Sequence, residues 1–389
     1  MFWKKWGGGT RLSVDYRFCF LYVIGSFSVI CGHLGNGINL FYDWFDPYSF
    51  HLPLFLFSSG YFFNKEKSDN VSNYVSHKVK TLLIPLYLWN FVYAGIVIIT
   101  HKLGFTIGWS VTIKSLLWGP FYNGHQFDYN CPSWFVAPLF LVHVFNILLR
   151  KIIRKLGINE NEYVITALYF VIAYFSYDFL QNPLLGEISL PLAHMFTMLP
   201  YYGVGTLYKE AIEGKYKIKT VVYFTIVFVG TLTLKHITGE CLSYNIVLFS
   251  IGERKNYFLL SYIQTFLGIA FWLKISNILL PIIQGKKWIK AISDSAFSIM
   301  VNQLFIAMLI KTVFAIIFIY TPFCGNFDLQ KYYSELYYIY CPKGNNHWCL
   351  LYDLAALIVP VYIQHFINKT KGICTQKIDS LNKKIKDNA

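Results

Sequence analysis

Charged side chains are scarce in this sequence: Asp, Glu, Lys and Arg make up 14% of its 389 residues. An ordinary soluble domain has about 25%, and the mean hydropathy here is +0.43, which excludes a water-soluble globular protein. The alternating ten-residue segments of a membrane β-barrel are also missing. The apolar runs are instead about 20 residues long, the length of a membrane-spanning helix. We therefore expect an all-α polytopic membrane protein.

Other signals are missing as well. The eight cysteines include no CxxC pair and no metal-ligand spacing, so we expect no metal site. One disulfide among Cys324, Cys341 and Cys349 fits the sequence, which does not select the pair. No small-residue cleavage site follows the basic N-terminus, so insertion is expected to start at the first apolar span. Repeats and low-complexity stretches are absent, and we expect one integral membrane domain over residues 1–368 with a short basic cytoplasmic tail at 369–389.

About ten apolar segments are candidates for transmembrane helices. They cover residues 18–34, 49–63, 82–101, 133–149, 162–180, 190–208, 218–236, 256–273, 292–320 and 348–367. The second segment is short for a membrane crossing, and the ninth is long enough to tilt or break.

The basic residues alternate between the connecting segments. With the N-terminus inside, 26 of the 34 Lys and Arg residues fall in segments on the inside and 6 in those on the outside. Such a bias is typical of cytoplasmic loops. It predicts a multi-pass protein of the cell membrane, plasma or inner, with both termini cytoplasmic. It also explains the net charge of +14 without a nucleic-acid partner.

Two histidines stand out in the apolar spans. His33 closes the first span, and His51 lies near the start of the second. Because adjacent spans run in opposite directions, both imidazoles are expected at one depth, toward the outside. An ionisable residue inside an apolar span is costly and marks a functional site, so both are candidate catalytic residues. Each could also be a satisfied residue at the membrane–water interface.

Further polar and small residues follow along the chain. Ser58, Ser59 and Gly60 either let helices approach closely or line a narrow passage. Lys78 and Lys80 lie at the cytoplasmic mouth of the third span, where they satisfy the positive-inside rule or bind phosphate groups.

The segment 321–347 on the outside is rich in tyrosine. Aromatic rings suit sugar binding, because they stack on the apolar faces of pyranoses. The same residues would also form the aromatic belt found at membrane interfaces, and this second interpretation is favoured. Trp134, at the outer end of the fourth span, either anchors that interface or forms a wall of an acceptor site.

Several stretches, in order, resemble the acyltransferase 3 family of integral membrane acyltransferases, which modify envelope and capsular sugars. They are VICGH in the first span, FHLPLFLFSSGYFF in the second, lysines with LLIP at the third, PSWFVAPLFLVHV in the fourth, LPYYGVGTLY in the sixth and ISDSAFSIMVNQLFI in the ninth. Each motif is weak alone, and together they cover most of the chain.

The resemblance implies catalysis by His33, as general base or through an acyl-histidine. It implies an acyl-CoA donor, taken here as acetyl-CoA, that enters from the cytoplasm. The acceptor would be a cell-envelope or capsular polysaccharide, such as lipopolysaccharide O-antigen, or a lipid-linked oligosaccharide precursor. We expect the donor at Arg17, Lys78, Lys80, Ser59 and Gly60, and the acceptor at Trp134 and Asn302.

The sequence departs from the family pattern at three places. Family members often carry Arg or Lys eleven residues before the histidine, where Tyr22 stands here, and Arg17 is the nearest basic residue. The two arginines usual at the third span are replaced by Lys78 and Lys80. Many relatives have a histidine in the ninth span, where this chain has Asn302 and Gln303.

Two other functions fit some of these features. A transporter or flippase of a lipid-linked oligosaccharide would also use many spans, polar groups at mid-depth and aromatic residues outside. Such proteins favour inverted repeats and broken helices, and the sequence shows no clear internal symmetry. A polysaccharide polymerase would want larger outer loops than the longest here.

Overall fold

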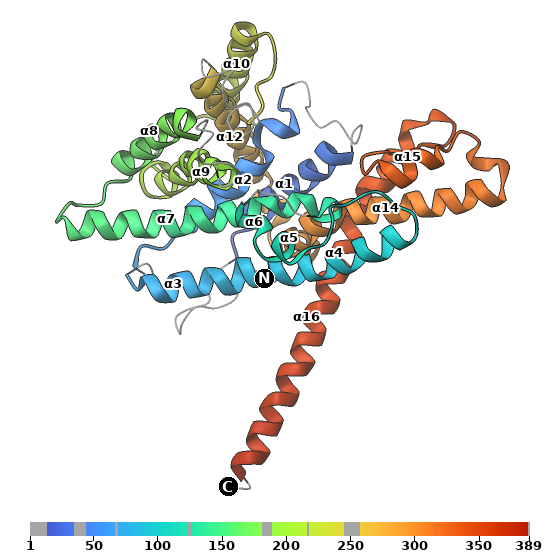
Figure 1. Cartoon of the computed structure of the whole chain (residues 1–389). Helices are drawn as coiled ribbons and strands as arrows, with labels where there is room; N and C mark the ends of the chain where they lie inside the picture. The colour runs from blue at the N-terminus through green and yellow to red at the C-terminus, as the bar shows by residue number, and fades with distance from the viewer. Residues whose placement is uncertain are drawn as a thin grey trace.

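A computed structural model describes residues 14–34, 44–66, 69–122, 127–180, 189–215, 218–244 and 257–387. Within these ranges the chain is helical and has no β-strand, so the predicted all-α fold is confirmed (Figure 1).

A helix occupies each of the ten predicted segments. The bounds are α1 (Tyr16–Leu34), α2 (Pro47–Tyr61), α4 (Ile84–Lys102), α7 (Val136–Lys155), α8 (Glu162–Leu180), α9 (Ser189–Leu207), α10 (Thr220–Thr238), α12 (Phe258–Ile283), α14 (Ala296–Tyr320) and α16 (Cys349–Asp387). Among the described residues, seven helical stretches are long and apolar enough to cross a membrane. They contain α1, α4, α7, α10, α12, α14 and α16. The number of ten spans therefore stays a prediction.

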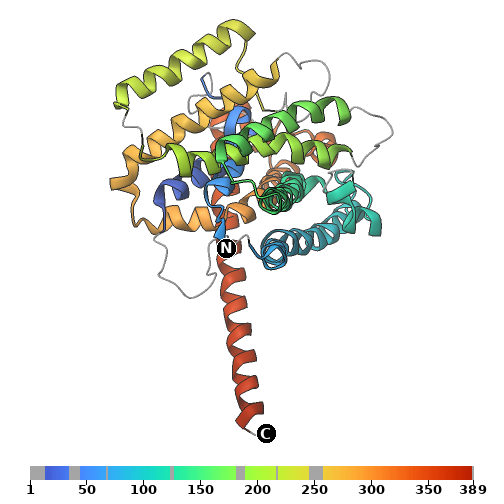
Figure 2. The ribbon, with the colours of Figure 1, turned by 90° about the vertical axis from the view of Figure 1, so that its left-hand side faces the viewer.

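Shorter elements extend several of these helices. The helix α3 (Val71–Lys78) continues through a π-helical segment, η2 (Val79–Leu83), into α4, which makes one long rod. A 3₁₀ segment, η3 (Asp128–Phe135), leads into α7. The rod and α7 pack side by side and are seen end-on in Figure 2. The ninth predicted span is broken at Ser295, which separates α13 (Lys287–Asp294) from α14.

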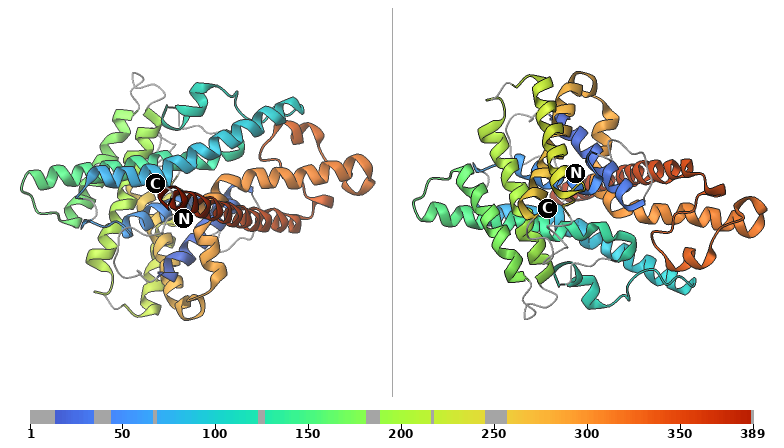
Figure 3. Two further views of the ribbon diagram at one scale, coloured as in Figure 1. Left: turned by 90° about the horizontal axis from the view of Figure 1, so that it is seen from below. Right: turned by 90° about the horizontal axis from the view of Figure 1, so that it is seen from above.

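The last helix is longer than the predicted tenth span. Its first part packs alongside α14 (Figure 3). The helix then continues as far as Asp387, and its C-terminal part projects from the body (Figure 1).

Ion pairs join several connections at one end of the bundle. Arg17 pairs with Glu213, Arg154 pairs with Asp69, and Lys65 pairs with both Glu162 and Glu210. These residues lie at the start of α1 and in or beside the connections that follow α2, α7 and α9, where Arg154 is in the last turn of α7 and Glu162 begins α8. All of these connections are predicted to face the cytoplasm. Their meeting at one end of the bundle agrees with the alternation inferred from the basic residues.

The short helix α2 lies at the centre of the bundle, where it contacts α1, α9 and α12. Its start is fixed by Pro47 in the first turn and by the Asp46 carboxylate, which accepts a hydrogen bond from the Tyr48 amide. Most of its residues are buried. Because it is apolar on all sides, α2 belongs to the core of the helix bundle.

Glycines let α2 and α9 approach each other closely. A Cβ atom on Gly60 would lie 2.0 Å from the Tyr202 carbonyl oxygen, and one on Gly205 would lie 2.1 Å from the Phe57 carbonyl oxygen. This close approach favours helix packing over a narrow passage as the interpretation of Gly60.

The cysteines around α15 (Leu329–Ser334) give a prediction about cross-linking. The Sγ atoms of Cys341 and Cys349 are 3.5 Å apart, whereas a disulfide bond holds them about 2.0 Å apart. We expect a mild oxidant such as diamide to link these two residues. Peptide mass spectrometry should detect the link, and Cys324→Ser should leave it intact. A link from Cys324 to either residue would show that the pair is wrong.

Candidate active site

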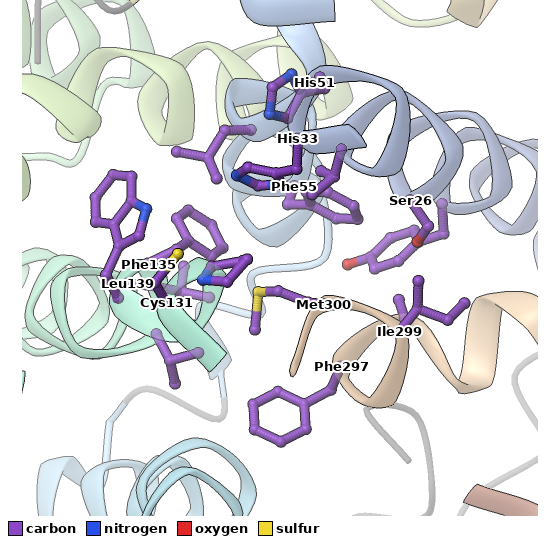
Figure 4. A pocket seen from close by; sticks show the side chains of 18 of the residues that line it. Ser26, His33, His51, Phe55, Cys131, Phe135, Leu139, Phe297, Ile299 and Met300 are labelled. Carbon is purple, nitrogen blue, oxygen red and sulfur yellow. The ribbon is translucent and has the colours of Figure 1, made fainter. Parts of the chain in front are cut away.

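A cavity of about 620 Å³ lies between α1, α2, the start of α7 and α14 (Figure 4). Its walls are mostly apolar, and residues of η2 and of the segment that follows α15 also contribute to them. The apolar lining includes Val29, Leu52, Phe55, Leu82, Phe135, Leu139, Phe297, Ile299 and Met300. Along α1 the lining extends from Tyr22 to His33, which is ~16 Å at 1.5 Å per residue. The cavity is therefore deep enough to hold a long, thin and largely apolar group.

His33 reaches this cavity from the last turn of α1. Its Nδ1 atom is buried and makes no hydrogen bond to a described residue. The Val29 backbone and the Gln303 side chain lie beside the ring. The imidazole therefore has a buried nitrogen without a hydrogen bond of standard geometry, which is available for proton transfer.

His51 lines the same cavity from α2, but both of its nitrogens are engaged. Its Nδ1 atom lies 2.5 Å from the Pro47 carbonyl, and its Nε2 atom lies 3.0 Å from the Tyr244 hydroxyl. Because a carbonyl can only accept, Nδ1 carries the proton, and Nε2 accepts from the tyrosine. The structure thus brings the two predicted histidines into one cavity, and it gives them different surroundings.

Two tyrosines surround the His33 ring. Tyr48 meets it edge-on with 6.5 Å between ring centroids, and the Tyr48 hydroxyl donates a hydrogen bond to the Gly32 carbonyl. Tyr337 is nearly parallel to His33, again with 6.5 Å between centroids. Tyr337 belongs to the tyrosine-rich segment, and it lines the cavity.

The two lysines predicted to bind the donor point in different directions. The Lys78 side chain turns inward, with Nζ 3.2 Å from His143 Nε2, whereas Lys80 is exposed. The other ring nitrogen of His143 lies 2.9 Å from the Tyr74 hydroxyl. Among the described residues, Lys78 has no carboxylate in ion-pair contact. A partly buried cation without a counter-ion suits an anionic ligand.

Lys78, His143 and Tyr74 form a group that we call the Lys78 cluster. It lies next to the end of the cavity that is remote from His33. Leu82 and Leu139 line the cavity, and each is four residues, about one helical turn, from Lys78 and His143 respectively. Tyr74 and His143 did not emerge from the sequence as site residues. His143 carried a usable signal, because it is an ionisable residue inside an apolar span.

Arg17 is held at the end of the bundle by carboxylates. Its guanidinium pairs with Asp15 and Glu213 at 2.5 Å each and also donates to the Tyr61 hydroxyl. It does not line the cavity. Its predicted contact with the donor would require an anion to compete with these two carboxylates.

The remaining predicted residues divide into two groups. Ser59 and Trp134 line the cavity, and the Trp134 ring lies 4.6 Å from that of His194. Gly60 faces the α9 backbone. Asn302 lies outside the cavity lining, where its amide accepts from the Tyr93 hydroxyl and donates to the Ser298 carbonyl.

The sequence matches a known protein family. A family model described as an acyltransferase domain matches residues 20–361, nearly the whole chain. No curated protein and no solved structure gives a significant match.

Proposed function

The chain belongs to the acyltransferase 3 family, and from this we propose that it is a membrane O-acetyltransferase acting on cell-envelope carbohydrate. The donor is acetyl-CoA, and the acceptor is a hydroxyl of a capsular or envelope polysaccharide, such as O-antigen, or of its lipid-linked precursor. Membership of the family does not favour the transporter alternative.

One observation carries this proposal. The deep apolar cavity has His33 at one end, and the Lys78 cluster lies about one helical turn beyond the opposite end. Lys78 supplies a positive charge for a phosphate of coenzyme A. The pantetheine arm is long and thin, so it can lie along the cavity past Ser59, with the thioester at His33.

The proposed reaction needs a single base. The acceptor hydroxyl oxygen attacks the thioester carbonyl carbon while its proton passes to His33. A C–O bond forms and the C–S bond breaks. The imidazolium then returns the proton to the coenzyme A thiolate, so the products are an acetyl ester and a free thiol.

The proposed direction of transfer follows the basic residues. The 26-to-6 distribution of Lys and Arg favours both termini in the cytoplasm of a cell with this protein in its plasma or inner membrane. The donor then arrives from the cytoplasm at the Lys78 end, and the acceptor reaches His33 from outside.

Substitution of Lys78 tests the proposal. Lys78→Met is expected to raise the KM for acetyl-CoA about tenfold or more, since a charge-assisted contact is lost, with kcat at saturating donor nearly unchanged. The assay measures labelled acetate transferred to polysaccharide and free thiol released by the purified protein.

The matched control is Lys80→Met, which removes an exposed lysine two residues away and should leave the donor KM near wild type. An unchanged KM in Lys78→Met would reject Lys78 as the donor contact. Absence of thiol release and of transferred label in the wild-type protein would reject acetyl-CoA as the donor.

A further inference from the structure

A buried lysine on α14 binds the loop that covers the His33 end of the cavity. Lys311 is completely buried. Its Nζ lies 2.7 Å from the Leu336 carbonyl and 3.4 Å from the Glu335 carbonyl. A buried ammonium group in an apolar helix is costly unless oxygen atoms solvate it. Here the two carbonyls do so, and the lysine in turn fixes the backbone of residues 335–336.

The next residue after this anchor is Tyr337. Its ring lines the cavity, lies nearly parallel to His33 and remains 54% exposed. Its hydroxyl is 3.4 Å from Cys131 Sγ. An aromatic ring that is half exposed, at the end of the cavity where His33 lies, is accessible to a ligand that approaches from outside the protein.

Resting on the proposed function, we propose that Tyr337 is the acceptor-positioning residue and that Lys311 is the anchor that holds it there. The ligand is a hydroxyl-bearing sugar ring, whose C–H face packs on the tyrosine while one hydroxyl points to His33. Lys311 acts through the loop backbone, so it is a positioning residue that does not touch the acceptor.

The shape and chemistry of the ring support a sugar as the ligand. A tyrosine offers a large, rigid apolar face at low entropic cost. The polar edge of a pyranose stays free to meet His33 and water. A polymeric acceptor exceeds the volume of the cavity, so one sugar unit at its His33 end is all that needs to be recognised.

The first test compares substitutions of two tyrosines in the same segment. Tyr337→Leu is expected to raise the acceptor KM roughly tenfold, with the donor KM unchanged. Tyr337→Phe keeps the ring and should stay near wild type. Tyr333 packs on Phe105, outside the cavity lining, so Tyr333→Leu is the matched control. The acceptor used is the cells' own polysaccharide, freed of acetyl esters by mild alkali.

The second test concerns the anchor. Lys311→Met should raise the acceptor KM as Tyr337→Leu does, and the double variant should be no worse than either single one, because both changes act through one ring. Lys311→Arg, which can still donate to both carbonyls, should restore part of the affinity. Lys331→Met removes an exposed lysine of the same segment and should have no effect.

Several results would overturn the inference. An unchanged acceptor KM in Tyr337→Leu would do so, as would additive effects of the Lys311 and Tyr337 changes. Calorimetric binding of the deacetylated polysaccharide, measured without donor, tests the same contact independently of the reaction. Loss of binding in Tyr337→Leu supports the inference even if acetyl-CoA proves to be the wrong donor, whereas wild-type binding in that variant rejects it.

Discussion

Replacing His33 with glutamine is expected to lower acetyl transfer by about 10²–10⁴-fold, the usual contribution of a general base, without lowering the amount of folded protein. The structure supports the second half of this statement. His33 Nδ1 is buried without a hydrogen bond of standard geometry, so the substitution removes no such bond of that nitrogen. Glutamine keeps the capacity for hydrogen bonding but cannot take a proton.

The variant is measured by labelled acetyl transfer, with abundance and melting temperature recorded for the same preparation. His51→Gln is the matched comparison, because that ring lines the same cavity but has both nitrogens bound to Pro47 and Tyr244. We expect His51→Gln to lower the melting temperature more and the rate less. Normally accumulated His33→Gln protein with a near wild-type rate would reject the general-base role.

The fold was predictable because its signal is local. Apolar runs of helical length predict the helices, and the alternation of basic residues predicts which connections lie together. The meeting of His33 and His51 follows from the reversal of direction between neighbouring spans. The length of the ninth segment predicted that it would tilt or break, and the break lies near its start, at Ser295, which leaves α14 25 residues long.

The donor end was less predictable, because it depends on contacts between distant segments. His143 and Tyr74 meet only because α3 packs on α7. The sequence grouped Lys78 with Lys80, although residues two apart on a helix do not face the same side. That rule indicates that only one of the two lysines faces inward, but it does not show which one.

The tyrosine-rich segment shows a second limit. It contains several tyrosines that the sequence does not distinguish from one another, and the sequence alone favoured an interfacial belt for all of them. Tyr337 differs from its neighbours because the loop is held by Lys311, whose partners are backbone carbonyls. Carbonyls are present in every residue, so no sequence pattern marks such an anchor.

Gly60→Ala and Gly205→Ala are each expected to destabilise the protein by more than ~3 kcal/mol, the upper part of the usual range for overpacking. Each new methyl group would meet a carbonyl oxygen of the facing helix at 2.0 Å and 2.1 Å respectively. Rotating a side chain cannot relieve a clash with backbone, so α2 and α9 would have to separate. That movement would disturb the central helix that carries His51 and Ser59.

The matched control is Gly95→Ala on α4, where an added Cβ has no described atom within 4 Å and alanine should be neutral or stabilising by about 0.5–1 kcal/mol. Abundance and melting temperature of the purified variants provide the measurement. The same experiment decides between the two interpretations of Gly60. If Gly60→Ala melts like wild type and raises the KM for acetyl-CoA, Gly60 is a donor contact, as first predicted. If it melts much lower, as Gly205→Ala should, the glycine is needed for packing, and Ser59 is the cavity-lining member of the pair.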